Sequence, residues 1–122
     1  MACTVLLADD LDHVRMVLRM RLELEDGIEV VAEATNGENA ITMASLHQPD
    51  VVILDNHMPV LTGLEALPRL KAAAPQARVV MLSSDSEVER RALAAGADAF
   101  VNKSDPLDAC IEEVAVGCRV PA

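Results

Sequence analysis

Short apolar runs, each the length of one strand, alternate with helical patterns along this chain. The clearest run covers residues 51–54 and leads directly into Asp55, with Pro59 shortly after. A short run without polar residues is typical of a strand buried on both faces, as in parallel sheets covered by helices. Pro59 cannot donate a ladder hydrogen bond, so the strand must end before it. We therefore expect Asp55 at the carboxyl end of a central parallel strand, where such sheets bind their ligands.

The same criteria divide the whole chain into strands and helices. They predict strands at 3–8, 28–34, 51–55, 78–82 and 98–102, and helices at about 12–24, 40–48, 64–74, 86–95 and 107–116. We expect Asp12 to be the N-cap of the first helix, and Gly27 and Gly117 to end the first and last helices. Asn36 and Gly37 are typical of a turn. Pro68 should fall in or near the first turn of its helix, where a missing N–H costs least.

This alternation of strands and helices restricts the fold. Strand–helix–strand units imply right-handed crossovers, which place helices on both faces of a parallel sheet. We predict a flavodoxin-like, doubly wound (βα)5 fold with a five-stranded parallel sheet in the order 2-1-3-4-5. Its switch point lies between the first and third strands. We expect residues 1–118 to form the domain and residues 119–122 to begin a linker or C-terminal tail.

Composition excludes several classes of function. The net charge of −10 argues against direct binding of nucleic acid by this chain, and Phe100 is the single aromatic residue available for stacking. No apolar run approaches the roughly 18 to 20 residues of a membrane span, and the start does not resemble a signal peptide. Cys3, Cys110 and Cys118 are odd in number and lack metal-ligand spacing. We therefore expect a cytoplasmic chain with three reduced thiols.

Polar groups follow four of the five predicted strands. They are Asp9 and Asp10 after the first strand, Asp55 after the third, Ser83 after the fourth and Lys103 after the fifth. Because the carboxyl ends of parallel strands open toward one edge, we expect a shared site. Three clustered carboxylates repel one another by several kcal/mol per pair at an effective dielectric of about 20. Such a cluster takes up a proton or binds a cation, and few oxygen ligands with room for water suit Mg²⁺.

The remaining groups suit phosphoryl chemistry. The amine of Lys103 and the hydroxyl of Ser83 are able to hold phosphoryl oxygens. A carboxylate such as Asp55, with Mg²⁺ beside it and a lysine opposite, is equipped to attack phosphorus and become an acyl phosphate.

In this order, these residues resemble a two-component response-regulator receiver (CheY-like) domain over nearly the whole chain. The resemblance rests on Asp9-Asp10, on Asp55 within Leu-Asp-Asn-His-Met-Pro, on Gly63, on Ser83 after Val-Val-Met-Leu, and on residues 96–103, Gly-Ala-Asp-Ala-Phe-Val-Asn-Lys. Residues 113–117 are similar to receivers that precede a LuxR-type helix-turn-helix domain. The resemblance implies cytoplasmic phosphorelay signal transduction and, through a DNA-binding domain absent from this chain, transcription regulation.

The resemblance also implies a metal site. Asp55 would accept the phosphoryl group from a histidine kinase or a phosphotransfer protein. Asp10 and Asp55 would bind Mg²⁺ directly, together with the backbone carbonyl of His57, and Asp9 would act largely through water. The His57 side chain itself is more simply read as a solvated loop residue.

Further roles follow from the same resemblance. Lys103 and Ser83 would contact phosphoryl oxygens, and Ser83 and Phe100 would form a switch in which the ring turns inward as the hydroxyl moves. Asp85 and His57 occupy positions that tune how water reaches the acyl phosphate. A surface of the fourth helix, the fifth strand and the fifth helix would serve a possible homodimer. No membrane partner is implied, and catalysis would be limited to self-catalysed phosphotransfer and dephosphorylation.

Three alternatives remain. An aspartate-nucleophile phosphatase would have an acid two positions after Asp55, where His57 stands, and a cap domain for which this length leaves no room. A flavodoxin-like cofactor binder would need a phosphate loop after the first strand, where Asp9 and Asp10 would repel the phosphate. The third is a stand-alone or phosphorylation-independent receiver that acts as a protein-docking module.

Overall fold

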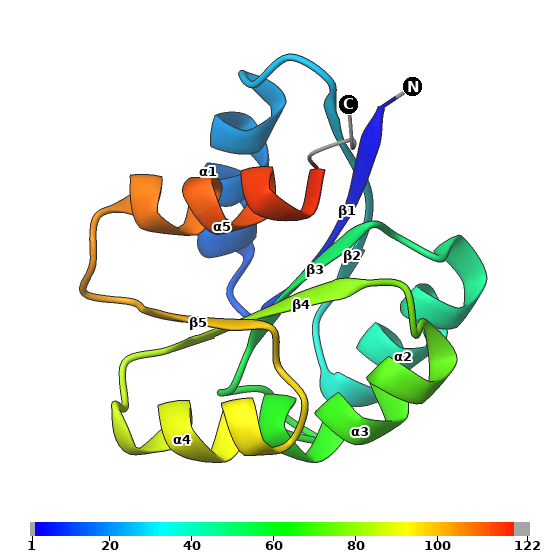
Figure 1. Ribbon diagram of the computed structural model, residues 1–122, viewed down its shortest axis with the longest axis vertical. Coiled ribbons are helices and arrows are strands. Elements are labelled where there is room, and N and C mark those ends of the chain that lie inside the picture. The colour runs from blue at the N-terminus through cyan, green and yellow to red at the C-terminus, as the bar shows by residue number, and fades with distance from the viewer. Residues whose placement is uncertain (1, 119–122) are drawn as a thin grey trace.

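A computed structural model of the chain describes residues 2–118. It contains one parallel sheet in the order β2-β1-β3-β4-β5 (Figure 1). The strands are β1 Cys3–Ala8, β2 Ile28–Ala34, β3 Val51–Asp55, β4 Arg78–Ser83 and β5 Ala99–Asn102. The predicted flavodoxin-like order is therefore confirmed. The predicted linker at 119–122 lies outside the described residues.

Helices cover both faces of this sheet. They are α1 Asp12–Glu23, α2 Gly37–His47, α3 Gly63–Ala73, α4 Glu87–Ala94 and α5 Leu107–Cys118. Helices α1 and α5 pack on one face, and α2, α3 and α4 pack on the other (Figure 1). Within residues 2–118, no helix is both long and apolar enough to span a bilayer.

The alternation of side chains along each strand creates two separate cores. In β3, Val51 and Ile53 belong to the core under α1 and α5, whereas Val52 and Leu54 belong to the core under α2, α3 and α4. All four are at most 1% exposed. Burying each contributes about 1.5–3 kcal/mol, which explains why this strand has no polar residue before Asp55.

The start of α1 differs from the prediction. Helix α1 begins at Asp12 itself, and Leu11 occupies the N-cap position without a side-chain cap. The carboxylate of Asp12 instead pairs with Arg15 one turn further along. Helix α1 ends at Glu23, so Gly27, with a φ of 81°, shapes the turn before β2 rather than closing the helix.

Three features of other helices also differ from the prediction. Asn36 is the N-cap of α2 rather than part of a separate turn, because its side chain accepts a hydrogen bond from the Asn39 backbone N–H at 2.8 Å. Pro68 lies inside α3, beyond its first turn, and the helix continues through it. Helix α5 runs through Gly117 and reaches Cys118.

The cysteines correct the prediction of three reduced thiols. Cys3, the first residue of β1, and Cys118, the last of α5, form a disulfide with a Cα–Cα distance of 5.4 Å. They are 115 positions apart, so their spacing in the sequence gives no sign that α5 returns to the start of β1. Cys110 is a free, buried thiol, and burial raises its pKa to about 12.

Candidate functional site

The site is centred on Asp55, the last residue of β3, whose side chain is 1% exposed. Strand β3 lies between β1 and β4, so the carboxylate emerges at the middle of the sheet edge. The chain turns sharply after it and returns at Gly63. A Cβ atom at Gly63 would lie 2.5 Å from the Asp55 carbonyl oxygen, so this close return requires a glycine.

Asn56 holds this turn together. Its backbone N–H donates to the Leu82 carbonyl at 3.0 Å, and its own carbonyl accepts from the Gly63 N–H at 3.1 Å. Its side-chain oxygen accepts from the Leu64 N–H at 3.0 Å, at the start of α3. Sequence reasoning missed this role. An Asn directly before a loop and a helix start is the available signal, because its short amide commonly binds nearby backbone groups.

Three carboxylates meet at this edge. Asp9, Asp10 and Asp55 each offer an oxygen, and these oxygens all lie within 4.8 Å of one another. Asp9 is buried and accepts the Leu11 backbone N–H at 2.9 Å through Oδ1, whereas Asp10 is exposed. Within residues 2–118, Asp9 Oδ2 and both carboxylate oxygens of Asp55 have no directed hydrogen-bond partner. Buried carboxylate oxygens without donors fit a hard divalent cation.

Lys103 approaches the cluster from β5. Its Nζ lies 2.7 Å from Asp55 Oδ1 and 3.5 Å from Asp9 Oδ2, as ion pairs rather than well-directed hydrogen bonds. The Lys103 backbone N–H donates to the Ser83 carbonyl at 3.0 Å, which fixes this segment beside β4. Burial lowers the pKa of Lys103, but the contacts with Asp55 and Asp9 outweigh it and leave the pKa raised.

The environment of Asp55 favours its neutral form. Burial is the largest cause and raises its pKa from 3.8 to about 6. The negative charge of Asp9 acts in the same direction, while Lys103 opposes it. The protein therefore balances the negative charge of Asp55 only in part, and a nearby positive charge would favour the ionised carboxylate.

The remaining predicted site residues differ in their surroundings; they are Ser83, Phe100, His57 and Asp85. Ser83 is fully buried at the end of β4, and its Oγ accepts the Asp85 backbone N–H at 3.1 Å. Phe100 is partly buried against the core under α2, α3 and α4. The side chains of His57 and Asp85 are exposed. The structure thus brings Asp9, Asp10, Asp55 and Lys103 into one cluster, with Ser83 at the adjacent strand end.

Arg15 is a second residue that sequence reasoning missed. Its side chain, 12% exposed, donates to the Asp9 carbonyl at 2.7 Å and to Glu33 at 2.9 Å. It also pairs with Asp12. Arg15 therefore ties the segment that carries the first two acids to α1 and to β2. No pattern in the sequence marks its contacts with Asp9 and Glu33, because these residues lie outside α1, in the segment after β1 and on β2.

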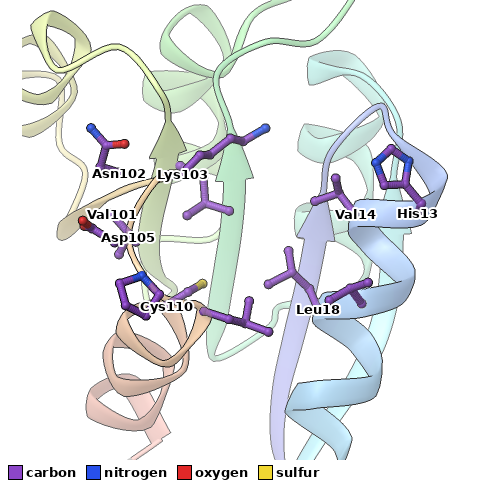
Figure 2. A pocket seen from close by; sticks show the side chains of 12 residues that line it. His13, Val14, Leu18, Val101, Asn102, Lys103, Asp105 and Cys110 are labelled. Carbon is purple, nitrogen blue, oxygen red and sulfur yellow. The ribbon is translucent and has the colours of Figure 1, made fainter.

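A cavity of about 260 Å³ lies beside the cluster. It is lined mainly by α1 and by the segment from Val101 to the first turns of α5, and Figure 2 shows Lys103 at its upper border. His13 and Val14 border it from α1, and Cys110 borders it from α5 (Figure 2). The edge with the acids is thus continuous with a largely apolar hollow.

A family model described as the response regulator receiver domain matches residues 5–115. This chain belongs to that family. The resemblance predicted from the strand ends is therefore confirmed, and the chain is a receiver domain of two-component signalling.

Individual relatives agree with this assignment. The response regulator protein VraR of Staphylococcus epidermidis is 40% identical over 107 residues, which cover 85% of this chain and 51% of VraR. The chemotaxis protein CheY of Bacillus subtilis is 36% identical over 116 residues, covering 93% of this chain and 96% of CheY. A LuxR-family response regulator from Aurantimonas superposes with a TM-score of 0.89 at 27% identity, covering 97% of this chain and 86% of that one. The chain spans about half the length of VraR.

Proposed function

We propose that Asp55 of this receiver accepts a phosphoryl group from the phosphohistidine of a histidine kinase or a phosphotransfer protein. The observation that carries the proposal is the position of its carboxylate, 1% exposed and 2.7 Å from the Lys103 ammonium, among the acids Asp9 and Asp10. In the transfer, an Asp55 oxygen forms a bond to phosphorus while the bond from phosphorus to the histidine nitrogen breaks.

The acidic cluster would hold Mg²⁺. Asp10 and Asp55 would be direct ligands with the His57 backbone carbonyl, and Asp9 would act largely through water. Asp9 Oδ2 and both carboxylate oxygens of Asp55 accept no hydrogen bond from the described residues, which supports this ligand set, because a hard cation would satisfy them. Bound Mg²⁺ would supply positive charge against the oxygens of the transferring group.

Lys103 and Ser83 would stabilise the phosphoryl group. The ammonium would move its contact from the carboxylate to a phosphoryl oxygen, where it neutralises charge. The Ser83 oxygen accepts the Asp85 N–H, so its hydroxyl proton remains able to donate to a second phosphoryl oxygen. Phe100 would repack as Ser83 moves. Since its ring has no hydroxyl, that response depends on packing alone.

The output would be transcription regulation through a DNA-binding domain that is not in this chain. The half-length match to VraR and the likeness to a LuxR-family regulator support this proposal. The net charge of −10 also argues against DNA contact by the receiver itself. The protein would act in the cytoplasm, with a possible homodimer through α4, β5 and α5, and would not turn over phosphomonoesters.

Intact-mass measurement after treatment with acetyl phosphate and Mg²⁺ tests the proposal. The wild-type chain should gain the mass of one phosphoryl group, and Asp55→Asn should gain none. Chelation of Mg²⁺ and Asp10→Asn should each strongly reduce the gain, whereas the exposed Asp26→Asn should not. An unchanged wild-type mass would reject phosphorylation and favour a receiver that docks partners without it.

A further inference from the structure

We propose that Cys3 and Cys118 are a reversible redox pair, closed by a small disulfide such as oxidised glutathione, which fastens the end of α5 to the start of β1. One premise of this inference, the location of the protein in the reducing cytoplasm, rests on the proposed function. In a reducing cytoplasm, disulfides that do form are usually transient and redox-sensing rather than structural. The pairing itself is a property of this fold.

The two cysteines are well placed for a bond that opens and closes. Their Cα atoms are 5.4 Å apart, within the usual range for disulfides. Both side chains are partly exposed and pack at the margin of the core under α1 and α5. A small thiol or disulfide can therefore reach them without unfolding of the domain, as exchange requires.

Other contacts hold the two thiols near each other when the bond is open. Arg78 Nε donates to the Glu113 carbonyl at 3.2 Å, and the two side chains form an ion pair. At Gly117, a Cβ atom would lie 2.6 Å from Val51 Cγ2, so the last turn of α5 rests directly on the sheet. These contacts do not involve sulfur. They hold the two thiols close together, so the effective concentration of each thiol near the other is high.

The exchange proceeds in two balanced steps. The thiolate of one cysteine attacks oxidised glutathione, forms a mixed disulfide and releases one glutathione thiolate. The second cysteine thiolate attacks the protein sulfur of that mixed disulfide, forms the Cys3–Cys118 bond and releases the second glutathione thiolate. The two cysteines are oxidised and one glutathione disulfide is reduced, and the two thiol protons pass to the departing thiolates.

This bond lies at the opposite end of the sheet from the acidic cluster. Val51, the first residue of β3, contacts the α5 end at Gly117, whereas Asp55, the last residue of β3, carries the carboxylate. Closing the bond should therefore restrict the end of α5 and leave phosphoryl acceptance unchanged. The thiol of Cys110 is 3% exposed and should take no part.

The experiment equilibrates the full chain in buffers of different oxidised-to-reduced glutathione ratio, then alkylates it in denaturant and measures intact mass. As the ratio rises, two alkylation sites should be lost together and should return on reduction. Cys110→Ser should keep this transition, while Cys3→Ser and Cys118→Ser should each abolish it. The oxidised form should also show slower amide exchange in the last turn of α5 and a thermal midpoint several degrees higher.

Three results would overturn the inference. They are a pair that stays reduced under excess oxidised glutathione, a bond that native reduced glutathione never opens, and a transition lost in Cys110→Ser. Labelling with acetyl phosphate on both redox forms provides the separate readout, and equal labelling is expected. Absence of labelling in both forms would reject the proposed function, while the alkylation result would still decide the redox inference.

Discussion

At the scale of single residues, Asp55 combines two opposing requirements. To accept phosphorus as proposed, its carboxylate must be charged, yet burial raises its pKa to about 6. Lys103 compensates one oxygen, and the neighbouring Asp9 adds repulsion. A carboxylate in this setting depends on added positive charge, which accounts for the proposed dependence on Mg²⁺.

Arg15 should position the acids for that cation without touching it. Arg15→Gln removes the hydrogen bond to the Asp9 carbonyl, so the Mg²⁺ concentration for half-maximal labelling by acetyl phosphate should rise about tenfold. Labelling at saturating Mg²⁺ should be nearly unchanged. Arg19→Gln is the matched control, because Arg19 also pairs with Glu33 but makes no contact with Asp9. Equal behaviour of the two variants would show that the Asp9 contact is unimportant.

The contacts that sequence reasoning found and missed differ in kind. Asp9, Asp10, Asp55 and Lys103 could be assembled from the sequence because parallel strands end at one edge, which needs only the strand order. Arg15 could not, since its long side chain reaches groups whose positions depend on how α1 packs.

At the scale of elements, the β3–α3 turn is the segment that most constrains the site. Gly63 lies against the Asp55 carbonyl, and Thr62 and Glu65 form a capping box that begins α3 immediately afterwards. The helix start and the strand end are thus fixed to each other through backbone atoms, which cannot move aside as a flexible side chain would.

Gly63→Ala should therefore damage both stability and function. The added Cβ would lie 2.5 Å from the Asp55 carbonyl oxygen and 2.9 Å from Asn56 Cα, so we expect a loss of about 2–3 kcal/mol in urea unfolding. Labelling by acetyl phosphate should fall as well. Gly27→Ala is the control: its φ of 81° makes it costly by about 1–2 kcal/mol, but it has open space and lies away from the cluster. Wild-type labelling in Gly63→Ala would contradict this account.

The positions of the helices and strands could be predicted from the sequence, but the residues at which they begin and end were harder to predict. The strand at residues 51–55 was predicted with its observed limits, because a buried apolar run leaves little choice of register. The cap of α1 was not, because Asp9 binds the Leu11 N–H and Arg15 draws Asp12 away. Both interactions depend on the tertiary structure rather than on local sequence preference.

At the scale of the whole molecule, the ionisation of Asp55 makes the free energy of unfolding depend on pH. In the folded state Asp55 keeps its proton up to a pH of about 6, whereas in the unfolded state it loses it near its ordinary value of 3.8. The folded state therefore binds more protons between these values, so the free energy of unfolding falls as pH rises through this range.

In metal-free buffer, this contribution should amount to at most about 3 kcal/mol between pH 4 and pH 7. Urea unfolding as a function of pH measures it. Asp55→Asn should remove the decline, and Mg²⁺ should reduce it in the wild-type chain by binding the folded state. The exposed Asp26→Asn should retain the wild-type decline. A wild-type profile identical to that of Asp55→Asn would show that the carboxylate carries no such penalty.

The sheet of this domain also separates two hydrophobic cores, one on each face. Phe100 packs among the side chains on the α2, α3 and α4 side, whereas Cys3 and Cys118 pack on the α1 and α5 side. A rearrangement caused by phosphorylation and a constraint imposed by the disulfide would thus act on opposite faces of the sheet. Only the strands are common to both. Such a molecule could receive two independent inputs, and one need not erase the other.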